Sequence, residues 1–154
     1  MDGVTEVRHA TCIAVEDRAA LIFGPSGAGK SDLALRAVST RVWDGTRGLV
    51  ARLVSDDQVV LELRHGQLLA SPPAAIAGRI EVRGLGILTL DYLTDCRVCL
   101  VVELDSRGEI ERLPSTDDHV ELLGSRVLRI RLRPFEASAA IKLVLALSRS
   151  KDNQ

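Results

Sequence analysis

Eight consecutive residues carry the clearest chemistry in the sequence. They match the spacing of the phosphate-binding loop in full, and they read Gly24-Pro25-Ser26-Gly27-Ala28-Gly29-Lys30-Ser31. The glycines let the backbone curl so that successive N–H groups point at phosphate oxygens, and a following helix presents its positive end to the same anion. In such a loop Lys30 neutralises the outer phosphates of a nucleotide and Ser31 ligates magnesium. An ordinary glycine turn needs neither the Lys-Ser pair nor this spacing, so the loop predicts nucleotide binding.

Two pairs of charged residues could complete a phosphoryl-transfer site. Asp56 and Asp57 follow an apolar strand, and two adjacent carboxylates repel, which can raise the proton affinity of one toward general-base duty. Strand alternation places Glu81 and Arg83 on one face beside two glycines, where they could meet magnesium and phosphate. Each pair also has an ordinary interpretation: a solvated acidic turn for the first and an exposed ion pair for the second. Residue chemistry alone leaves both interpretations open.

Other notable residues give weaker signals. A histidine before a strand, such as His9, is more often structural than catalytic. Cys96 and Cys99 have metal-like spacing, but residues three apart in a strand point to opposite faces, so zinc binding is not expected. Three arginines alternate along one predicted strand: Arg129, Arg131 and Arg133. We interpret them as the charges that protect an edge strand, rather than as a surface for nucleic acid.

The composition sets the class of protein that holds these residues. The chain has 154 residues with 20 basic and 21 acidic side chains, so it fits one domain without a strongly charged surface. No apolar run exceeds five residues, whereas a bilayer span needs roughly 20, and acids stand where a secretory signal would be basic. We therefore expect no membrane segment and a cytoplasmic location. We also expect one domain over residues 1–147 and a polar tail over residues 148–154.

The predicted elements form a mixed α/β sheet around the loop. Residues 10–15 and 19–23 are apolar stretches whose separation suits a hairpin and is too short for a parallel crossover. After the loop, residues 31–42 have the apolar spacing of a helix packed on a sheet. Residues 51–55 predict a strand that runs into the two aspartates. Further strands, including a hairpin about His65 and Gly66, are predicted at residues 58–64, 67–70, 80–83, 86–90, 97–104 and 127–133.

A final helix is predicted to start at Pro134 and to span residues 135–149. It is apolar over most of its circumference, which one buried face hardly explains. We therefore expect a contact with another subunit and a homo-oligomer. The strand at residues 97–104 is nearly all apolar, which favours a central place in the sheet.

Three segments, in this order, make the sequence resemble the HPr kinase/phosphorylase family. They are the loop at residues 24–31, Leu53-Val54-Ser55-Asp56-Asp57, and Glu81-Val82-Arg83-Gly84-Leu85-Gly86-Ile87. The last segment is the specific one, because phosphate-binding loops are common to many unrelated enzymes. His9-Ala10 also looks like the start of the family's catalytic domain, and the resemblance covers residues 6–113 best. The chain is therefore similar to short members that consist of the catalytic domain only.

The resemblance implies a bacterial enzyme that uses ATP and Mg²⁺ to phosphorylate a serine of HPr, the phosphocarrier protein of the sugar phosphotransferase system. It also implies removal of that phosphate by phosphorolysis, which consumes inorganic phosphate and releases pyrophosphate. The implied fold is similar to the nucleotide-binding part of phosphoenolpyruvate carboxykinase, and the implied assembly is a homo-oligomer such as a hexamer.

Catalytic roles carried over by position follow from the same resemblance. Asp56 is the expected base that takes the serine proton. In the reverse direction it is the acid that protonates the leaving oxygen. Asp57 and His9 are expected to pair and to orient that site. Arg112, in Glu111-Arg112-Leu113, is similar to the family arginine that approaches the transferred phosphoryl group.

Binding roles are carried over in the same way. Ser31 and Glu81 are expected to hold magnesium, with Arg83 near the phosphates. Two segments depart from the family pattern. Pro25 stands where many members have an acid, and Arg133-Pro134-Phe135-Glu136 lacks the usual glycine-arginine-asparagine turn.

Two other functions are compatible with a nucleotide-binding loop, because the loop does not specify a reaction. One is a non-catalytic regulatory module that senses ATP or phosphate and signals through the C-terminal helix. The other is a P-loop kinase that acts on a small molecule. Replacing Asp56 by Asn is expected to abolish transfer in a kinase and to leave the partner contacts of a sensor intact.

Overall fold

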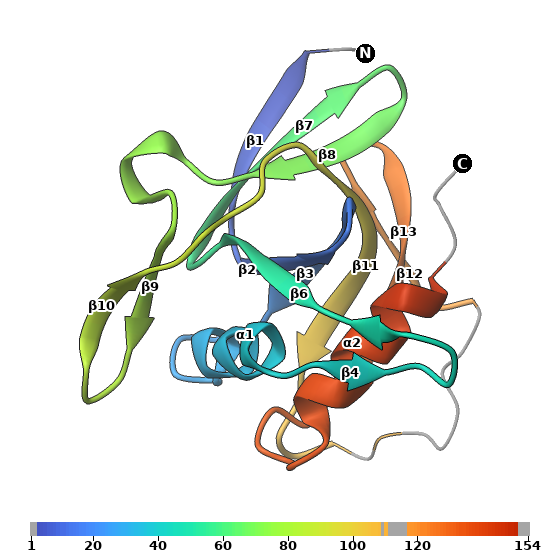
Figure 1. The fold of residues 1–154 in the computed structure, drawn as a ribbon. Coiled ribbons are helices and arrows are strands. Elements are labelled where there is room, and N and C mark those ends of the chain that lie inside the picture. Colours follow the sequence, from blue (N-terminus) through green and yellow to red (C-terminus); the bar gives the residue numbers. More distant parts are fainter. Residues whose placement is uncertain (1–2, 109, 111–116, 151–154) are drawn as a thin grey trace.

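A curled β-sheet carries the fold, with two helices against one of its faces (Figure 1). The computed structural model describes residues 3–108, 110 and 117–150. Within these residues the large sheet has nine strands, in the order β1-β7-β8-β11-β3-β2-β6, with β13 beside β11 and β12 beside β13. The strands are β1 (Val4–His9), β2 (Thr11–Val15), β3 (Arg18–Phe23), β6 (Ala51–Ser55), β7 (Gln58–Arg64), β8 (Gln67–Ser71), β11 (Cys96–Leu104), β12 (His119–Leu122) and β13 (Ser125–Leu132).

Four strands run in the same direction and end at one edge of the sheet. β2 is antiparallel to both β3 and β6, so β3 and β6 point the same way. β11 is parallel to β3, and β13 is parallel to β11. The sheet is therefore mixed, and the two predicted hairpins, β2–β3 and β7–β8, are present. In open α/β sheets, the carboxyl ends of parallel strands are where ligands bind.

One irregularity lies where β6 reaches this edge. Cys12 of β2 pairs with Ser55, but the next residue, Ile13, pairs with Leu53, so Val54 is an extra residue on β6. Such a bulge changes the side of the strand to which the following side chains point. Leu53 lies in the core under the helices, and Val54 lies in the core on the other face, which also holds Cys12, the partner of Ser55.

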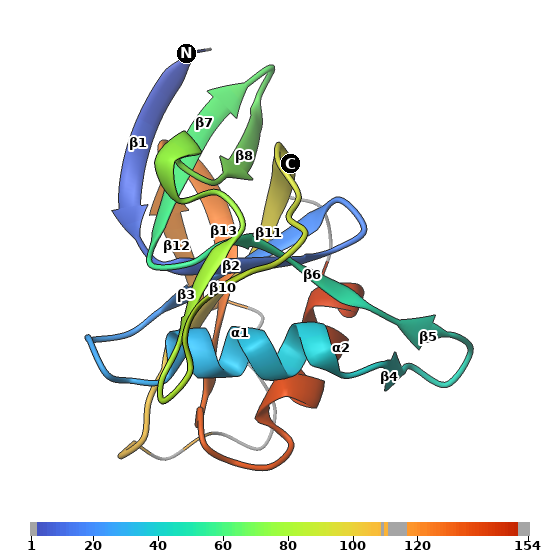
Figure 2. The same ribbon diagram turned by 60° about the vertical axis from the view of Figure 1, so that its left-hand side comes forward.

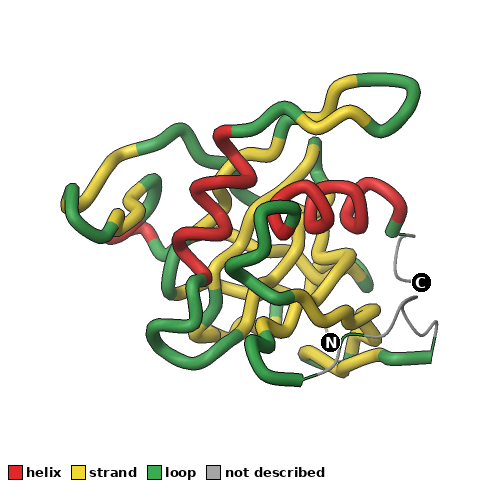
Figure 3. The backbone as a smooth tube through the Cα atoms, turned by 90° about the horizontal axis from the view of Figure 1, so that it is seen from below, coloured by secondary structure: helices red, strands yellow, loops and turns green. Residues whose placement is uncertain are grey.

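The helices α1 (Lys30–Ser39) and α2 (Ala139–Arg149) lie on the same face of the sheet (Figure 3). Their buried side chains join those of β2, β3, β6 and β11 in one apolar core. This packing within the chain buries the stripe of α2 that consists of Ala139, Ala140, Leu143, Val144 and Leu147. Most of the apolar character of α2 is therefore explained without a second subunit.

Both helices are shorter than predicted. α1 ends at Ser39 because Thr40 is extended, and β4 (Val42–Trp43) pairs with β5 (Gly48–Leu49) where the helix was expected to continue. The β-branched Thr40 and Val42 suit extended backbone better than a last helical turn.

The start of α2 is also a correction, because Pro134 does not begin the helix. The helix begins at Ala139, after turns over residues 134–138. At the other end, Ser150 is buried and accepts a 2.9 Å hydrogen bond from Nη2 of Arg18. Residues 148–150, which were predicted to belong to a loose tail, are thus part of the fold.

A small hairpin extends from the sheet beside α1 (Figure 2). A 3₁₀ turn, η1 (Ala74–Ile76), leads into β9 (Arg79–Val82), which pairs with β10 (Gly86–Thr89). Only one face of β9 reaches the core, through the fully buried Ile80. The other side of the hairpin is therefore exposed, and Glu81 and Arg83 lie there.

The arginine-bearing strand, β13, is not simply an edge strand, which corrects the prediction. β11 pairs with residues 128–132 of β13, and β12 pairs with residues 125–128 on its other side. β12 and β1 were not predicted as strands. Arg129 of this strand forms a 2.9 Å ion pair with Asp118.

The curl of the sheet encloses a second core on the face away from the helices. Its members come mainly from β2, β3, β6, β7, β8, β11, β12 and β13, and they include Cys12 and Cys96. Cys99 lies in the first core instead. The two members of the Cys-x-x-Cys segment therefore point to opposite faces, as predicted. In the part of the chain that the structure describes, neither helix has the length and apolarity to cross a bilayer.

Candidate active site

The residues with predicted chemistry gather at the edge where β3, β6, β11 and β13 end. The phosphate-binding loop follows β3, and Asp56-Asp57 follows β6. Asp105 follows β11, and residues 133–135 follow β13. Across this edge the loop lies between the aspartate pair on one side and the β11 and β13 ends on the other.

The loop has the turn expected from its glycines. The N–H of Ala28 donates to the carbonyl of Pro25 at 3.0 Å, and Gly29, the residue just before α1, has φ 99°. Gly27 has φ 80°, so two of the glycines adopt the left-handed conformation that other residues resist. The curl of the backbone into this turn is thus a direct consequence of the glycine positions.

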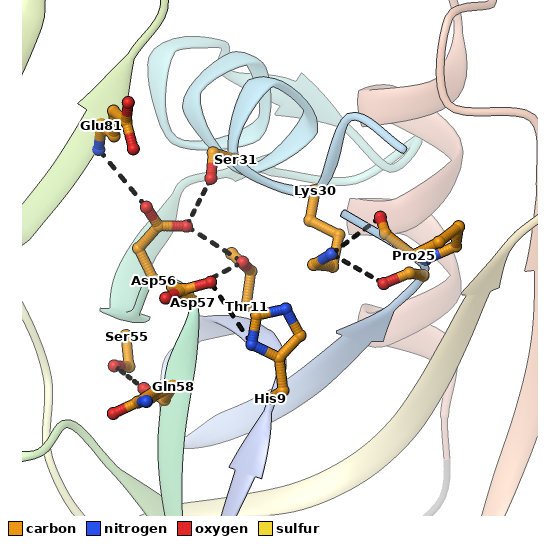
Figure 4. A network of polar contacts seen from close by, with 11 residues as sticks. His9, Thr11, Pro25, Lys30, Ser31, Ser55, Asp56, Asp57, Gln58 and Glu81 are labelled. Atoms are coloured by element: carbon orange, nitrogen blue, oxygen red, sulfur yellow. Dashed lines mark hydrogen bonds and ion pairs between the residues drawn. The ribbon is translucent and has the colours of Figure 1, made fainter. Parts of the chain in front are cut away.

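The Lys30 side chain lies over the loop from the first turn of α1 (Figure 4). Its Nζ donates to the carbonyl oxygens of Gly24 at 2.7 Å and Pro25 at 3.1 Å, and the residue is buried. An ammonium held in this way can exchange its carbonyl partners for phosphate oxygens. Pro25 itself offers a carbonyl but no N–H.

Asp56 is buried and accepts hydrogen bonds from three elements (Figure 4). Its Oδ1 accepts from the hydroxyl of Ser31 at 2.6 Å and from that of Thr11 at 3.0 Å. Its Oδ2 accepts from the backbone N–H of Glu81 at 3.3 Å. A buried carboxylate needs such donors, and these three connect α1, β2 and β9 to the end of β6.

Asp57 faces the other way. Its side chain is 64% exposed, and its Oδ1 lies 3.4 Å from Nδ1 of His9. The backbone at Asp57 has φ 70°, and its N–H donates to Oγ1 of Thr11 at 3.3 Å. The pairing of Asp57 with His9, which the resemblance implied, is therefore present.

Thr11 is a site residue that the sequence reasoning missed. It is fully buried, and its hydroxyl donates to Asp56 while accepting from the N–H of Asp57. This one hydroxyl fixes the two aspartates relative to each other. The available signal was a polar residue at the start of an otherwise apolar strand.

A pocket of about 390 Å³ opens over the loop, a volume typical of small-molecule sites. Its lining contains most of the predicted site residues and several that were not predicted: His9, Thr11, Ser26, Gly27, Gly29, Lys30, Ser31, Asp32, Leu35, Asp57, Glu81, Val82, Arg83 and Phe135. Asp56 is not part of this lining because it lies behind Ser31 and Thr11. Arg112 lies outside the described residues.

Phe135 was not predicted to be a site residue, and it approaches the loop closely. A Cβ added to Gly29 would lie 2.9 Å from both Cε1 and Cζ of Phe135. Arg36 of α1 holds the segment around this ring, because its Nη2 donates to the carbonyl of Pro134 and its Nη1 donates to that of Glu136 at 3.4 Å.

A further carboxylate, Asp105, lies at the end of β11. The N–H groups of Gly108 and Arg107, with smaller effects from Arg131 and Arg133, lower the pKa of Asp105. Asp105 therefore stabilises its own turn as an anion. Among the described residues, no cluster of three or more His, Cys, Asp or Glu could hold a metal by itself.

Comparison with known proteins shows the family of the chain. The family model described as HPr Serine kinase C-terminal domain matches residues 3–151. The chain belongs to this family. Membership of the HPr serine kinase family confirms the resemblance that the three sequence segments indicated.

Individual relatives show how far the similarity to HPr serine kinases extends. The HPr kinase/phosphorylase of Caldicellulosiruptor bescii is 36% identical over 154 residues, which cover 92% of this chain and 47% of the relative. That of Geobacillus sp. (strain WCH70) is 33% identical over an alignment of 157 positions, which covers 94% of this chain and 48% of the relative. The chain thus spans about half the length of the curated relatives it matches.

A solved structure shares the fold. The Hpr(Ser) kinase/phosphatase from Coxiella burnetii superposes with a TM-score of 0.71 at 25% identity, covering 94% of this chain and 88% of that one. The mixed α/β architecture with a curled sheet is therefore the architecture of an HPr kinase/phosphatase.

Proposed function

We propose that the chain is an ATP- and Mg²⁺-dependent protein-serine kinase domain that phosphorylates HPr and removes the phosphate by phosphorolysis. The observation that carries this proposal is the 2.6 Å hydrogen bond between Ser31 and Asp56, which joins the phosphate-binding loop to the aspartate pair. The family membership and the names of the relatives support HPr as the protein substrate.

The loop supplies the binding energy for the phosphates. The N–H groups around Gly27 and Gly29 and the positive end of α1 attract the phosphate oxygens, and Lys30 neutralises their charge. Phosphoryl transfer needs mainly positioning and charge stabilisation, so a rigid loop beside fixed carboxylates suits the reaction.

The contacts favour Asp57, rather than the expected Asp56, as the proton acceptor. Both carboxylate oxygens of Asp56 already accept hydrogen bonds inside the protein. Asp57 lines the pocket and is 64% exposed, so it can reach a serine hydroxyl of a docked protein. In this scheme His9 orients the carboxylate of Asp57, and Thr11 fixes the backbone beside it.

The residues present fit a magnesium ion. Mg²⁺ prefers oxygen ligands and is usually held by one or two carboxylates together with water and substrate phosphates, so the lack of an all-protein cluster among the described residues is expected. Ser31 and Glu81 would hold it, with Asp56 accepting the Ser31 hydroxyl hydrogen bond behind them. When bound, the ion neutralises charge on the transferred phosphoryl group.

In the reverse direction, inorganic phosphate would attack the phosphorus of phosphoserine. The serine oxygen–phosphorus bond breaks, a phosphorus–oxygen bond to the attacking phosphate forms, and pyrophosphate leaves. Asp57, protonated in the forward direction, returns its proton to the serine oxygen. Arg83 lines the pocket and supplies positive charge beside the phosphates.

Transfer of labelled phosphate from ATP to HPr, with Mg²⁺ present, tests the proposal. Phosphoserine on HPr is the expected product, and nucleotide binding without any phosphoserine would reject the kinase function. Consumption of ATP without HPr, stimulated by a metabolite, would indicate the small-molecule kinase instead.

A variant pair separates the kinase from a nucleotide sensor. Asp57→Asn should keep nucleotide binding and lose phosphoserine formation, whereas a sensor would keep its response. Asp95→Asn is the matched control because Asp95 also has positive φ, 54°, and a 51% exposed side chain, but it does not line the pocket.

The carboxykinase likeness, the cytoplasmic location and the homo-oligomer remain predictions.

A further inference from the structure

Phe135 combines two properties that core packing does not explain. Its side chain is 66% exposed, yet it lines the pocket over the phosphate-binding loop. Neither apolar core includes it. A large ring left in contact with water at the wall of a pocket is a surface that a ligand can cover.

The ring lies on the loop itself. Its Cε1 and Cζ atoms approach Gly29 so closely that a Cβ there would be 2.9 Å away. Gly29 immediately precedes Lys30, whose ammonium is held over the loop by two carbonyls. A molecule whose phosphates occupy the loop therefore passes within reach of this ring.

The ring and the carboxylates lie on opposite sides of the loop. Asp57 follows β6, the loop follows β3, and Phe135 follows β13, with β11 between β3 and β13. If the terminal phosphate points toward Asp57, where the protein substrate is modified, the rest of the nucleotide extends away from Asp57. That direction leads toward Phe135.

The segment that carries the ring is anchored to the loop helix. The guanidinium of Arg36 donates to the carbonyls on both sides of Phe135, those of Pro134 and Glu136. Arg36 also pairs with Asp32 at 2.9 Å. The backbone on both sides of the ring is therefore held in position before any ligand arrives, which lowers the entropic cost of binding.

We infer that Phe135 is the stacking surface for the base of the bound nucleotide. This inference rests on the proposed function, since it assumes that the loop binds a nucleoside phosphate. Base–aromatic stacking tolerates any base, because every base has a π-face. Loss of the ring should weaken nucleotide binding by roughly 10-fold, within the range for one base stacked on an aromatic side chain.

ADP and pyrophosphate form the decisive pair of ligands, because both carry two phosphates and only ADP carries a nucleoside. Calorimetric titration of the whole protein with each ligand, with Mg²⁺ present, compares them directly. Phe135→Leu keeps an apolar side chain against Gly29 but removes the aromatic face, and Phe135→Trp keeps the face. Trp43→Leu is the matched control, since Trp43 is also 66% exposed but does not line the pocket.

We expect Phe135→Leu to bind ADP roughly 10-fold more weakly and pyrophosphate unchanged, and Phe135→Trp to bind ADP as well as the parent. Equal losses for both ligands would overturn the inference and assign Phe135 to loop packing. Unchanged ADP binding in Phe135→Leu would also overturn it. Failure of the parent protein to bind either ligand would instead reject the proposed function.

Discussion

The hydroxyl of Ser31 lies 2.6 Å from Oδ1 of Asp56, so the first turn of α1 is tied to the end of β6. The same oxygen accepts from Thr11, and the other carboxylate oxygen accepts from the backbone of Glu81. Asp56 therefore connects the phosphate-binding loop to the β9–β10 hairpin. The geometry of the pocket depends on this buried carboxylate, although Asp56 does not line the pocket.

Removing the Asp56 carboxylate should destabilise the protein as well as the site. In Asp56→Ala, the hydroxyls of Thr11 and Ser31 lose their acceptor, and a buried group left unpaired costs about 1–3 kcal/mol. Urea unfolding, followed by circular dichroism, measures the loss. Asp57→Asn is the comparison. Asn tolerates the φ of 70° at this position and the side chain is exposed, so the free energy of unfolding should change by less than about 1 kcal/mol. Equal effects in the two variants would contradict the structural role of Asp56.

Gly29→Ala should be more harmful than Gly27→Ala, although both glycines have positive φ. A methyl group at Gly27 meets nothing within 4 Å, so only the backbone cost of roughly 1–2 kcal/mol applies. At Gly29 the methyl group also meets the ring of Phe135. Thermal unfolding of the two variants measures the difference.

The steric part of that difference can be isolated. Phe135→Ala made in the Gly29→Ala background should recover part of the lost stability, because the ring that the methyl group meets is gone. The same change in the Gly27→Ala background should recover none. Absence of any coupling between residues 29 and 135 would mean that the ring moves away freely.

The buried thiols should be inert at neutral pH and should make the fold sensitive to alkali. Burial, with smaller effects from Asp17 and Asp95, raises the pKa of Cys96 to about 11. Burial, with a smaller effect from Cys96, raises the pKa of Cys12 well above its ordinary value of 9.0. A disulfide reagent at pH 8 should therefore titrate none of the three thiols in the native protein and all three in urea.

The sign of the pH dependence follows from the raised pKa. The folded protein keeps these protons longer than the unfolded chain, so this contribution to stability is full below pH 9 and is lost as the pH rises through about 11. The free energy of unfolding should fall over that interval. Cys12→Ala with Cys96→Ala should flatten this decrease, and an unchanged slope would assign it to other groups.

At acid pH, Asp44 should contribute in the opposite sense. Hydrogen bonds from the N–H groups of Arg47 and Thr46, with a further bond from the Thr46 hydroxyl, lower its pKa to about 2. Its stabilising effect is therefore present above pH 3.8 and is lost as the pH falls through about 2. An NMR titration of the Asp44 carboxyl should give this midpoint, and a midpoint near 4 would mean that the turn is not formed in solution. Asp44→Asn should reduce the acid dependence of unfolding.

Local sequence features predicted much of the fold and of the loop. The hairpins β2–β3 and β7–β8 follow from short connections, and the curl of the loop follows from the positions of Gly27 and Gly29. The proximity of Asp56, Glu81 and the loop was predicted only through the family resemblance. The contacts themselves join residues 25 positions apart in sequence, as for Ser31 and Asp56.

What the sequence could not predict depends on contacts between distant segments. β1 pairs with β7, and its alternating charged residues gave little sign of a strand. The turns over residues 134–138 look helical in sequence, but Arg36, about 100 residues earlier, binds the carbonyls of Pro134 and Glu136 there. Phe135 became visible as a pocket residue only once those turns were known.

The bulge at Val54 makes the length of β6 critical. One residue inserted or deleted between Leu53 and Asp56 would rotate the carboxylate toward the opposite side of the sheet, away from Ser31. Natural variation in chain length should therefore avoid this stretch and accumulate at exposed turns, such as the one at Gly45. The number of residues between the phosphate-binding loop and the aspartates can therefore vary in the β4–β5 segment. The number of residues at the end of β6 should not vary.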